Sequence, residues 1–103
     1  MQVELPFVKP RYDKERRILF FGGEVVKAFK KPAPNQEPII LAFEEEGWPP
    51  KIYSPLRPNP EQDPKVMLNH TVQDLNRSLD RQDLIRFGLD HTGEQRIEWR
   101  VQP

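Results

Sequence analysis

The chain has 103 residues, of which 36% are hydrophobic and 31% are charged, and this suits one domain with one core. It has no cysteine, which excludes disulfide frameworks and thiolate zinc sites. We find no signal peptide and no apolar run as long as a membrane span, so we expect a cytoplasmic protein without a membrane partner.

The net charge of zero hides an uneven distribution. Residues 1–31 hold eight Lys and Arg against four Asp and Glu, whereas residues 63–103 hold six against seven. Basic charge usually supplies the non-specific part of DNA affinity, so the balanced total argues against nucleic acid as a partner.

An extended arm and a hairpin are predicted at the start of the chain. Pro6 and Pro10 stand among apolar residues and favour an extended arm over residues 1–17, which could pair with a second copy and form a homodimer. Residues 18–21 and 24–29 are rich in β-branched and aromatic side chains, and Gly22-Gly23 between them is typical of a tight β-turn. The folded domain is therefore expected over residues 18–103.

A helix capped by Asn35 is predicted to follow, with Gly47 at its C-terminal end. Its buried stripe would consist of Ile39, Ile40 and Phe43. The acidic run 44–46 opposes the helix dipole, and we interpret it as a solvated face or, less often, as a patch for a basic partner. Trp48 is expected to anchor the core, and residues 52–56 are expected to form a short helical turn broken by Pro55.

The longest predicted helix covers residues 63–79, with Asp63 as its N-cap and Pro64 at its first position. Its apolar face consists of Leu68, Val72, Leu75 and Leu79, with Thr71 beside them. Its other face carries His70, Gln73 and Arg77, with Asn69 and Asn76 on the flank. This pattern predicts that one face packs in a core and the other meets a partner.

A second hairpin is predicted at the end of the chain. Residues 84–87 and 95–101 are the expected strands, and in the latter Ile97 and Trp99 alternate with charged residues, as in a strand with one buried face. The connection over residues 88–94 is rich in turn formers and is expected to project as a flexible loop.

In order and pattern these elements resemble the C-terminal DNA-binding domain of OmpR-type response regulators. The run Ile39 to Phe43 followed by Gly47 resembles the first core helix of that family, and the apolar side of helix 63–79 resembles its recognition helix. Ile85-Arg86-Phe87, leading into a glycine-containing loop, resembles the entry to its wing. The resemblance implies an α+β winged helix, with a three-helix core whose middle helix is short, an N-terminal β-hairpin and a C-terminal β-hairpin wing.

The resemblance also implies a sequence-specific or architectural DNA-binding module of the kind found in transcriptional regulators. Double-stranded DNA would be the partner, with Asn69, His70 and Gln73 facing base edges in the major groove. Phosphate contacts would come from Lys65, Arg77 and Arg81, and from Arg86, Arg96 or Arg100 near the wing.

The alternative is a non-catalytic protein–protein interaction module on the same scaffold, which the zero net charge, the acidic run and the apolar arm favour. Catalytic residues, metal ligands and cofactors are not expected. His91 adjoins Asp90 in a turn-rich stretch, and His70 has only Asp74 as an acidic neighbour on its helix. The sequence contains no glycine-rich phosphate loop and no nucleophile motif.

Overall fold

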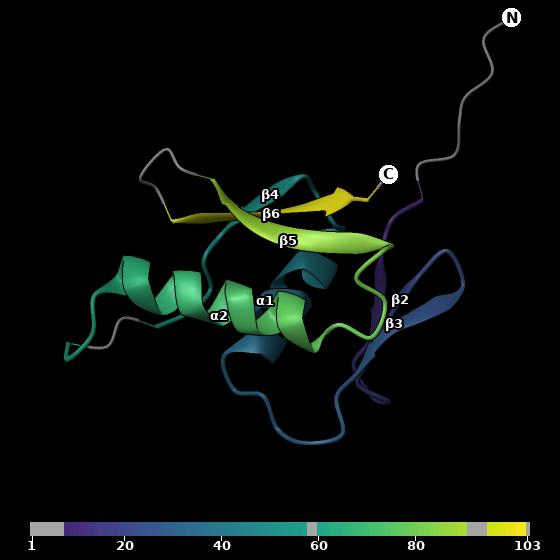
Figure 1. The fold of residues 1–103 in the computed structure, drawn as a ribbon, viewed down its shortest axis with the longest axis horizontal. Coiled ribbons are helices and arrows are strands. Elements are labelled where there is room, and N and C mark those ends of the chain that lie inside the picture. The colour runs from purple at the N-terminus through teal and green to yellow at the C-terminus, as the bar shows by residue number, and fades with distance from the viewer. Residues whose placement is uncertain (1–7, 58–59, 91–94, 103) are drawn as a thin grey trace, which may run out of the picture.

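The computed structural model describes residues 8–57, 60–90 and 95–102, and these form two three-stranded antiparallel sheets and two helices. Sheet A contains, in order, β1 (Arg11–Asp13), β2 (Ile18–Phe21) and β3 (Glu24–Ala28). Sheet B contains β4 (Lys51–Tyr53), β6 (Arg96–Val101) and β5 (Ile85–Asp90), with β6 in the centre. The helices are α1 (Gln36–Glu45) and α2 (Pro64–Ser78). In Figure 1 sheet B lies over α2, and sheet A lies beside the C-terminal end of α2.

The predicted winged helix with a three-helix core is wrong. Where a short middle helix was expected, Lys51–Tyr53 forms β4 and pairs with β6, so the C-terminal hairpin becomes part of a three-stranded sheet. Ile52 is buried between two exposed neighbours, which is the alternation of a strand. Pro50 and Pro55 flank this stretch and leave too little room for a helix.

The predicted first hairpin is confirmed. β2 and β3 pair around Gly22-Gly23, whose φ angles of 61° and 81° are those that glycine adopts without strain. Residues 11–13 of the expected arm form β1 against β2, and residues 1–7 lie outside the described part of the chain.

The ends of α1 differ in how well the sequence predicted them. Asn35 occupies the N-cap position, but its side chain makes no capping hydrogen bond; the backbone carbonyl of Ala33 accepts from the first N–H groups instead. At the other end Gly47 has a φ of 80°, and the N–H of Trp48 donates to the carbonyl of Phe43 at 2.8 Å. This is a Schellman motif, and the Trp48 ring stacks on Phe43 with a centroid distance of 5.0 Å. The Gly47 cap and the core role of Trp48 are thus confirmed.

The predicted faces of the longest helix are confirmed with one exception. Asp63 accepts a hydrogen bond from the N–H of Lys65 at 2.8 Å and so caps α2, as expected. The buried face contains Leu68, Thr71, Val72 and Leu75. Asn76 was expected beside the solvent face but is buried, with 8% of its surface exposed. The reason is a pair of hydrogen bonds to β5, described below.

A single hydrophobic cluster joins both sheets to both helices. Its fully buried members include Leu19 and Val26 from sheet A, Ile39 and Phe43 from α1, Leu75 from α2, and Ile85 and Ile97 from sheet B.

β5 extends through Asp90, so the first part of the predicted loop 88–94 is strand, and residues 91–94 lie outside the described part. Neither helix in the described ranges has the length and apolar character needed to cross a membrane.

Candidate functional site

The residues predicted to contact DNA do not form one surface. Five of them are exposed on α2, namely Lys65, Asn69, His70, Gln73 and Arg77. Arg86 and Arg96 instead lie on the outer face of sheet B, because their strand neighbours Phe87 and Ile97 face the core. α2 packs under the inner side of this sheet, so the two sets are separated by the thickness of the sheet (Figure 1).

Arg81 belongs to neither surface. It follows α2, and its guanidinium binds Asp83 through Nε at 3.0 Å and Glu24 through Nη1 at 2.6 Å. These partners raise the pKa of Arg81 further above its ordinary value, and the same contact lowers the pKa of Asp83. Arg81 therefore fastens the end of α2 to the β2–β3 hairpin.

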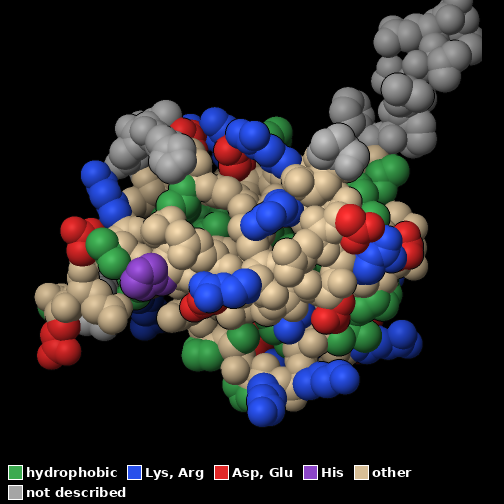
Figure 2. All heavy atoms as spheres, viewed as in Figure 1, with side chains coloured by type: hydrophobic (Ala, Val, Ile, Leu, Met, Phe, Trp, Pro, Cys, Tyr) green, Lys and Arg blue, Asp and Glu red, His purple; other side chains and the backbone are tan. Residues whose placement is uncertain are grey.

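The exposed face of α2 carries balanced charge. Arg77 pairs with Asp74 at 2.9 Å, and near the other end of the helix the cation Lys65 stands two residues after the capping carboxylate of Asp63. Figure 2 accordingly shows acidic and basic side chains next to each other over α2. His70 and Asp74 line a hollow of about 370 Å³, but the residues that the structure describes contain no group of three or more metal-ligating side chains. His91 lies outside those residues.

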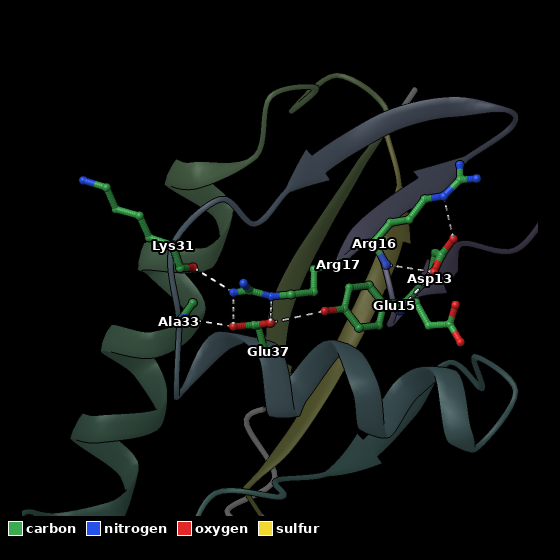
Figure 3. Close-up of polar contacts among 8 residues, drawn as sticks. Asp13, Glu15, Arg16, Arg17, Lys31, Ala33 and Glu37 are labelled. Atoms are coloured by element: carbon green, nitrogen blue, oxygen red, sulfur yellow. Dashed lines mark hydrogen bonds and ion pairs between the residues drawn. The ribbon is translucent and has the colours of Figure 1, made fainter.

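A partly buried ion pair ties sheet A to the start of α1 (Figure 3). Arg17 donates from Nε and Nη2 to the two carboxylate oxygens of Glu37 at 2.7 and 2.8 Å, and Glu37 also accepts from the N–H of Ala33 and the hydroxyl of Tyr12. The hydrogen bonds from Arg17 lower the pKa of Glu37, while burial, followed by the charge of Glu37, raises the pKa of Tyr12. Both oxygens of Glu37 are engaged within the protein, so the cluster acts as a structural tie.

Glu44, in the acidic run at the end of α1, also has a structural role. Oε1 of Glu44 accepts from the backbone N–H of Tyr12 at 2.8 Å and from Nε1 of Trp48 at 2.9 Å. Glu44 thereby joins α1 to the edge of sheet A and orients the core Trp48, whereas Glu45 and Glu46 are exposed. This role depends on contacts between distant segments and gives no signal in the sequence.

The outer face of sheet B brings together side chains from three strands in cross-strand rows. In the first row Arg86 is opposite Arg100; in the second Gly88 and Lys51 flank Glu98; in the third Asp90 and Tyr53 flank Arg96. The carboxylates of this face are covered by its cations. The side chain of Glu98 is 16% exposed against 72% for its partner Arg100, and that of Asp90 is 6% exposed against 38% for its partner Lys51. The surface that a partner would meet is therefore basic.

Two further features distinguish this face. Tyr53 is 64% exposed, and the guanidinium of Arg96 lies 5.2 Å from its ring centroid, so an aromatic ring and a cation are presented together. Beside Gly88 the face is hollowed by about 270 Å³ between Arg86, Glu98 and Arg100.

Sequence reasoning found Arg86, Arg96 and Arg100 but missed Lys51, Tyr53 and Gly88. Lys51 and Tyr53 were assigned to or beside a helical turn, and Gly88 was assigned to a loop. The alternation of exposed and buried residues around Ile52 was a signal for Lys51 and Tyr53, but it covers only three residues.

Comparisons of the chain with protein-family models, curated proteins and solved structures gave no match.

Proposed function

We propose that this chain is a non-catalytic protein-interaction module that binds an acidic surface of another protein through the outer face of sheet B. The observation that carries the proposal is the layering of charge on this face, with Lys51, Arg86 and Arg100 outermost and the carboxylates beneath them. The carboxylates Asp90 and Glu98 hold their cations in place, and because the described residues of this face include four cations and two carboxylates, a positive excess remains for an approaching partner.

The exposed Tyr53 supports the same proposal. Tyrosine and arginine are enriched in protein interfaces, because both offer a large contact area together with a polar group. Tyr53 and Arg96 stand in one row of this face and contact each other, so they would reach a partner as a unit.

Reading of duplex DNA by α2 stays a prediction, and two observations favour the protein partner over it. Arg77 is paired with Asp74, and the two cations Arg77 and Lys65 are equalled in number by Asp74 and the capping Asp63, whereas DNA affinity depends on an excess of cations. The cations of sheet B lie on the far side of the sheet from α2, so one duplex would not meet both sets at once.

The test compares two matched double variants with the unmodified chain in fluorescence anisotropy. Lys51→Gln with Arg86→Gln removes two cations from sheet B, and Lys65→Gln with Arg77→Gln removes two from α2. The probes are a labelled glutamate-rich peptide and a labelled DNA duplex. We expect the sheet B variant to lose about fivefold or more of its affinity for the peptide, the effect of losing about 1 kcal/mol at an interface, and the α2 variant to keep it.

Circular dichroism before binding establishes that both variants are folded. Binding of duplex DNA that is tighter than binding of the peptide, falls steeply with salt and is lost in the α2 variant would overturn the proposal in favour of DNA reading. Absence of any peptide binding by the unmodified chain would also overturn it.

A further inference from the structure

We infer that the hollow beside Gly88, between Arg86 and Arg100, is the seat for one carboxylate of an extended acidic segment in the partner protein. This inference rests on the proposed function and adds to it the place and the chemistry of one contact. Three observations support it. Two residue features, one in the first row and one in the second, are unfavourable for local stability, and the third observation is the size of the hollow beside them.

The first feature is Gly88 within a strand. Glycine in a strand interior is destabilising relative to alanine, because it loses more conformational freedom on folding. Nothing local requires it: Gly88 is absent from the positive-φ positions, and a Cβ added there would meet only Glu98, at an ordinary contact distance of 3.7 Å. What the glycine provides is room beside the Glu98 side chain, whose Oε1 would lie 3.8 Å from such a Cβ, and strand glycines often mark places where a ligand approaches closely.

The second feature is the pair of arginines in the first row. Arg86 and Arg100 are directly opposite each other on neighbouring strands, where like charges destabilise a sheet. Arg100 is bonded to Glu98 at 3.0 Å, but Arg86 has no hydrogen-bond or ion-pair partner among the residues that the structure describes. Glu98 already offsets part of this repulsion through Arg100, and an anion bound at Arg86 would offset the rest and supply the partner for Arg86.

These two features lie side by side, on one face and in adjacent rows. Positions where a chain departs from its local preferences are expected at functional sites, because there a ligand completes the interactions. Gly88, which has no local structural need, thus lies next to Arg86, which has no partner among the described residues, and this points to a ligand. Because Arg86 is positively charged, the ligand is expected to be negatively charged.

The size of the hollow limits the ligand. A volume of about 270 Å³ lies below the range of about 300–1,000 Å³ that is typical of sites for small molecules and cofactors. It suits a single side chain better than a nucleotide. A glutamate or aspartate carboxylate can also receive paired hydrogen bonds from the planar guanidinium of Arg86.

The rows indicate that the rest of the ligand is extended. Rows one and three are separated by four residues along a strand, which is about 13 Å. Residues four apart in an extended peptide have the same spacing and point to the same side. A second acidic residue at that spacing would reach Arg96, and the residue between them would reach Lys51.

The test measures binding of the labelled glutamate-rich peptide to the full chain carrying Gly88→Val. Valine places its side chain in the hollow, changes no charge and suits a strand, so urea denaturation is expected to show a stability no lower than that of the unmodified chain. Peptide affinity is expected to fall about tenfold, and Gly88→Ala should give a smaller loss because it fills less of the space. Arg86→Lys should also weaken binding, since lysine keeps the charge but lacks the paired donors.

The outcomes separate this inference from the proposed function. Suppose that Gly88→Val binds the peptide as the unmodified chain does, while the Lys51→Gln/Arg86→Gln variant loses binding. This result would rule out the hollow as the carboxylate site and would leave the proposed function standing. No peptide binding by the unmodified chain would overturn both. Tighter binding of a labelled single-stranded DNA, abolished by Gly88→Val, would keep the hollow as a site but overturn the carboxylate as its ligand.

Discussion

The carboxamide of Asn76 on α2 makes two hydrogen bonds with the backbone of Phe87 in β5: Nδ2 donates to the carbonyl at 2.7 Å, and Oδ1 accepts from the N–H at 2.8 Å. β5 is an edge strand of sheet B, so the side chain takes the place of a neighbouring strand at this residue. Glu44 of α1 does the same on β1 of sheet A, by accepting from the N–H of Tyr12. Each helix thus covers the edge of one sheet with a polar side chain.

Replacement of Asn76 by alanine should lower the free energy of unfolding by about 2–4 kcal/mol. The change removes both hydrogen bonds and leaves the N–H and carbonyl of Phe87 without this partner at a buried site, where each unsatisfied group costs about 1–3 kcal/mol. Urea denaturation measures the loss. Asn69→Ala is the matched control on the exposed face and should stay within about 0.5 kcal/mol. Equal effects of the two substitutions would show that the bridge to Phe87 does not stabilise the fold.

Asn76→Asp should produce a pH-dependent defect. An ionised carboxylate can accept from the N–H of Phe87 but cannot donate to its carbonyl, whereas a protonated carboxyl can do both. Burial would raise the pKa of the new carboxyl, so its destabilisation should be largest at neutral pH and should shrink as the pH falls. Urea titrations of the variant and the unmodified chain at each pH measure this difference. A difference in stability that does not change with pH would contradict the bonding scheme.

Glu44→Ala should destabilise the protein by about 1–3 kcal/mol, because the N–H of Tyr12 and Nε1 of Trp48 would both lose their acceptor. The neighbouring Glu45→Ala removes the same charge from an exposed position and should stay within about 0.5 kcal/mol. Unfolding followed by tryptophan fluorescence gives both values. If the two variants were equally stable, Glu44 would be no more than a surface charge.

Leu75→Ala should cost about 2–5 kcal/mol, since Leu75 is fully buried and alanine would leave a cavity in the core. Gln73→Ala, on the exposed face of the same helix, should change the free energy of unfolding by about 0.5 kcal/mol or less. Chemical denaturation of the two variants compares the faces of α2. Similar small effects at both positions would refute the packing described for this helix.

The ion pair of Arg17 and Glu37 should make the free energy of unfolding depend on pH. Hydrogen bonds from Arg17 hold the pKa of folded Glu37 below its ordinary value of 4.5, so the ionised form stabilises the fold above that pH and this contribution disappears as the pH falls through the folded-state pKa. Glu37→Gln should cost about 1 kcal/mol at neutral pH, because the pair is partly exposed to solvent. The two proteins should converge in stability in acid.

Urea denaturation at neutral pH and at a pH below the folded-state pKa of Glu37 tests this convergence. The pKa values of Asp13 and Asp83 are also lowered by their partners, and these groups affect both proteins alike. A deficit of Glu37→Gln that persists unchanged in acid would rule out the ion pair as the source of the pH dependence.

The sequence by itself determined the elements that depend on near neighbours. The Gly22-Gly23 hairpin, the cap of Asp63 on α2, the end of α1 at Gly47 and the buried stripe containing Leu75 all follow from interactions within a few residues. Glycine φ preferences, side-chain caps and helical periodicity act between near neighbours, and for this reason they can be predicted from one amino-acid sequence.

Only the tertiary structure decided the fold class and the candidate site. Residues 51–53 become a strand because β6, more than forty residues later, offers them a pairing edge, and this pairing overturned the predicted winged helix. The same pairing placed Lys51 and Tyr53 on one face with Arg86, Gly88 and Arg96. Asn76 turned inward for a similar reason, since the N–H and carbonyl of Phe87 on the edge of β5 lie within its reach. Strand pairing and side-chain hydrogen bonds between distant segments depend on which groups meet in space. The local sequence pattern does not contain that information.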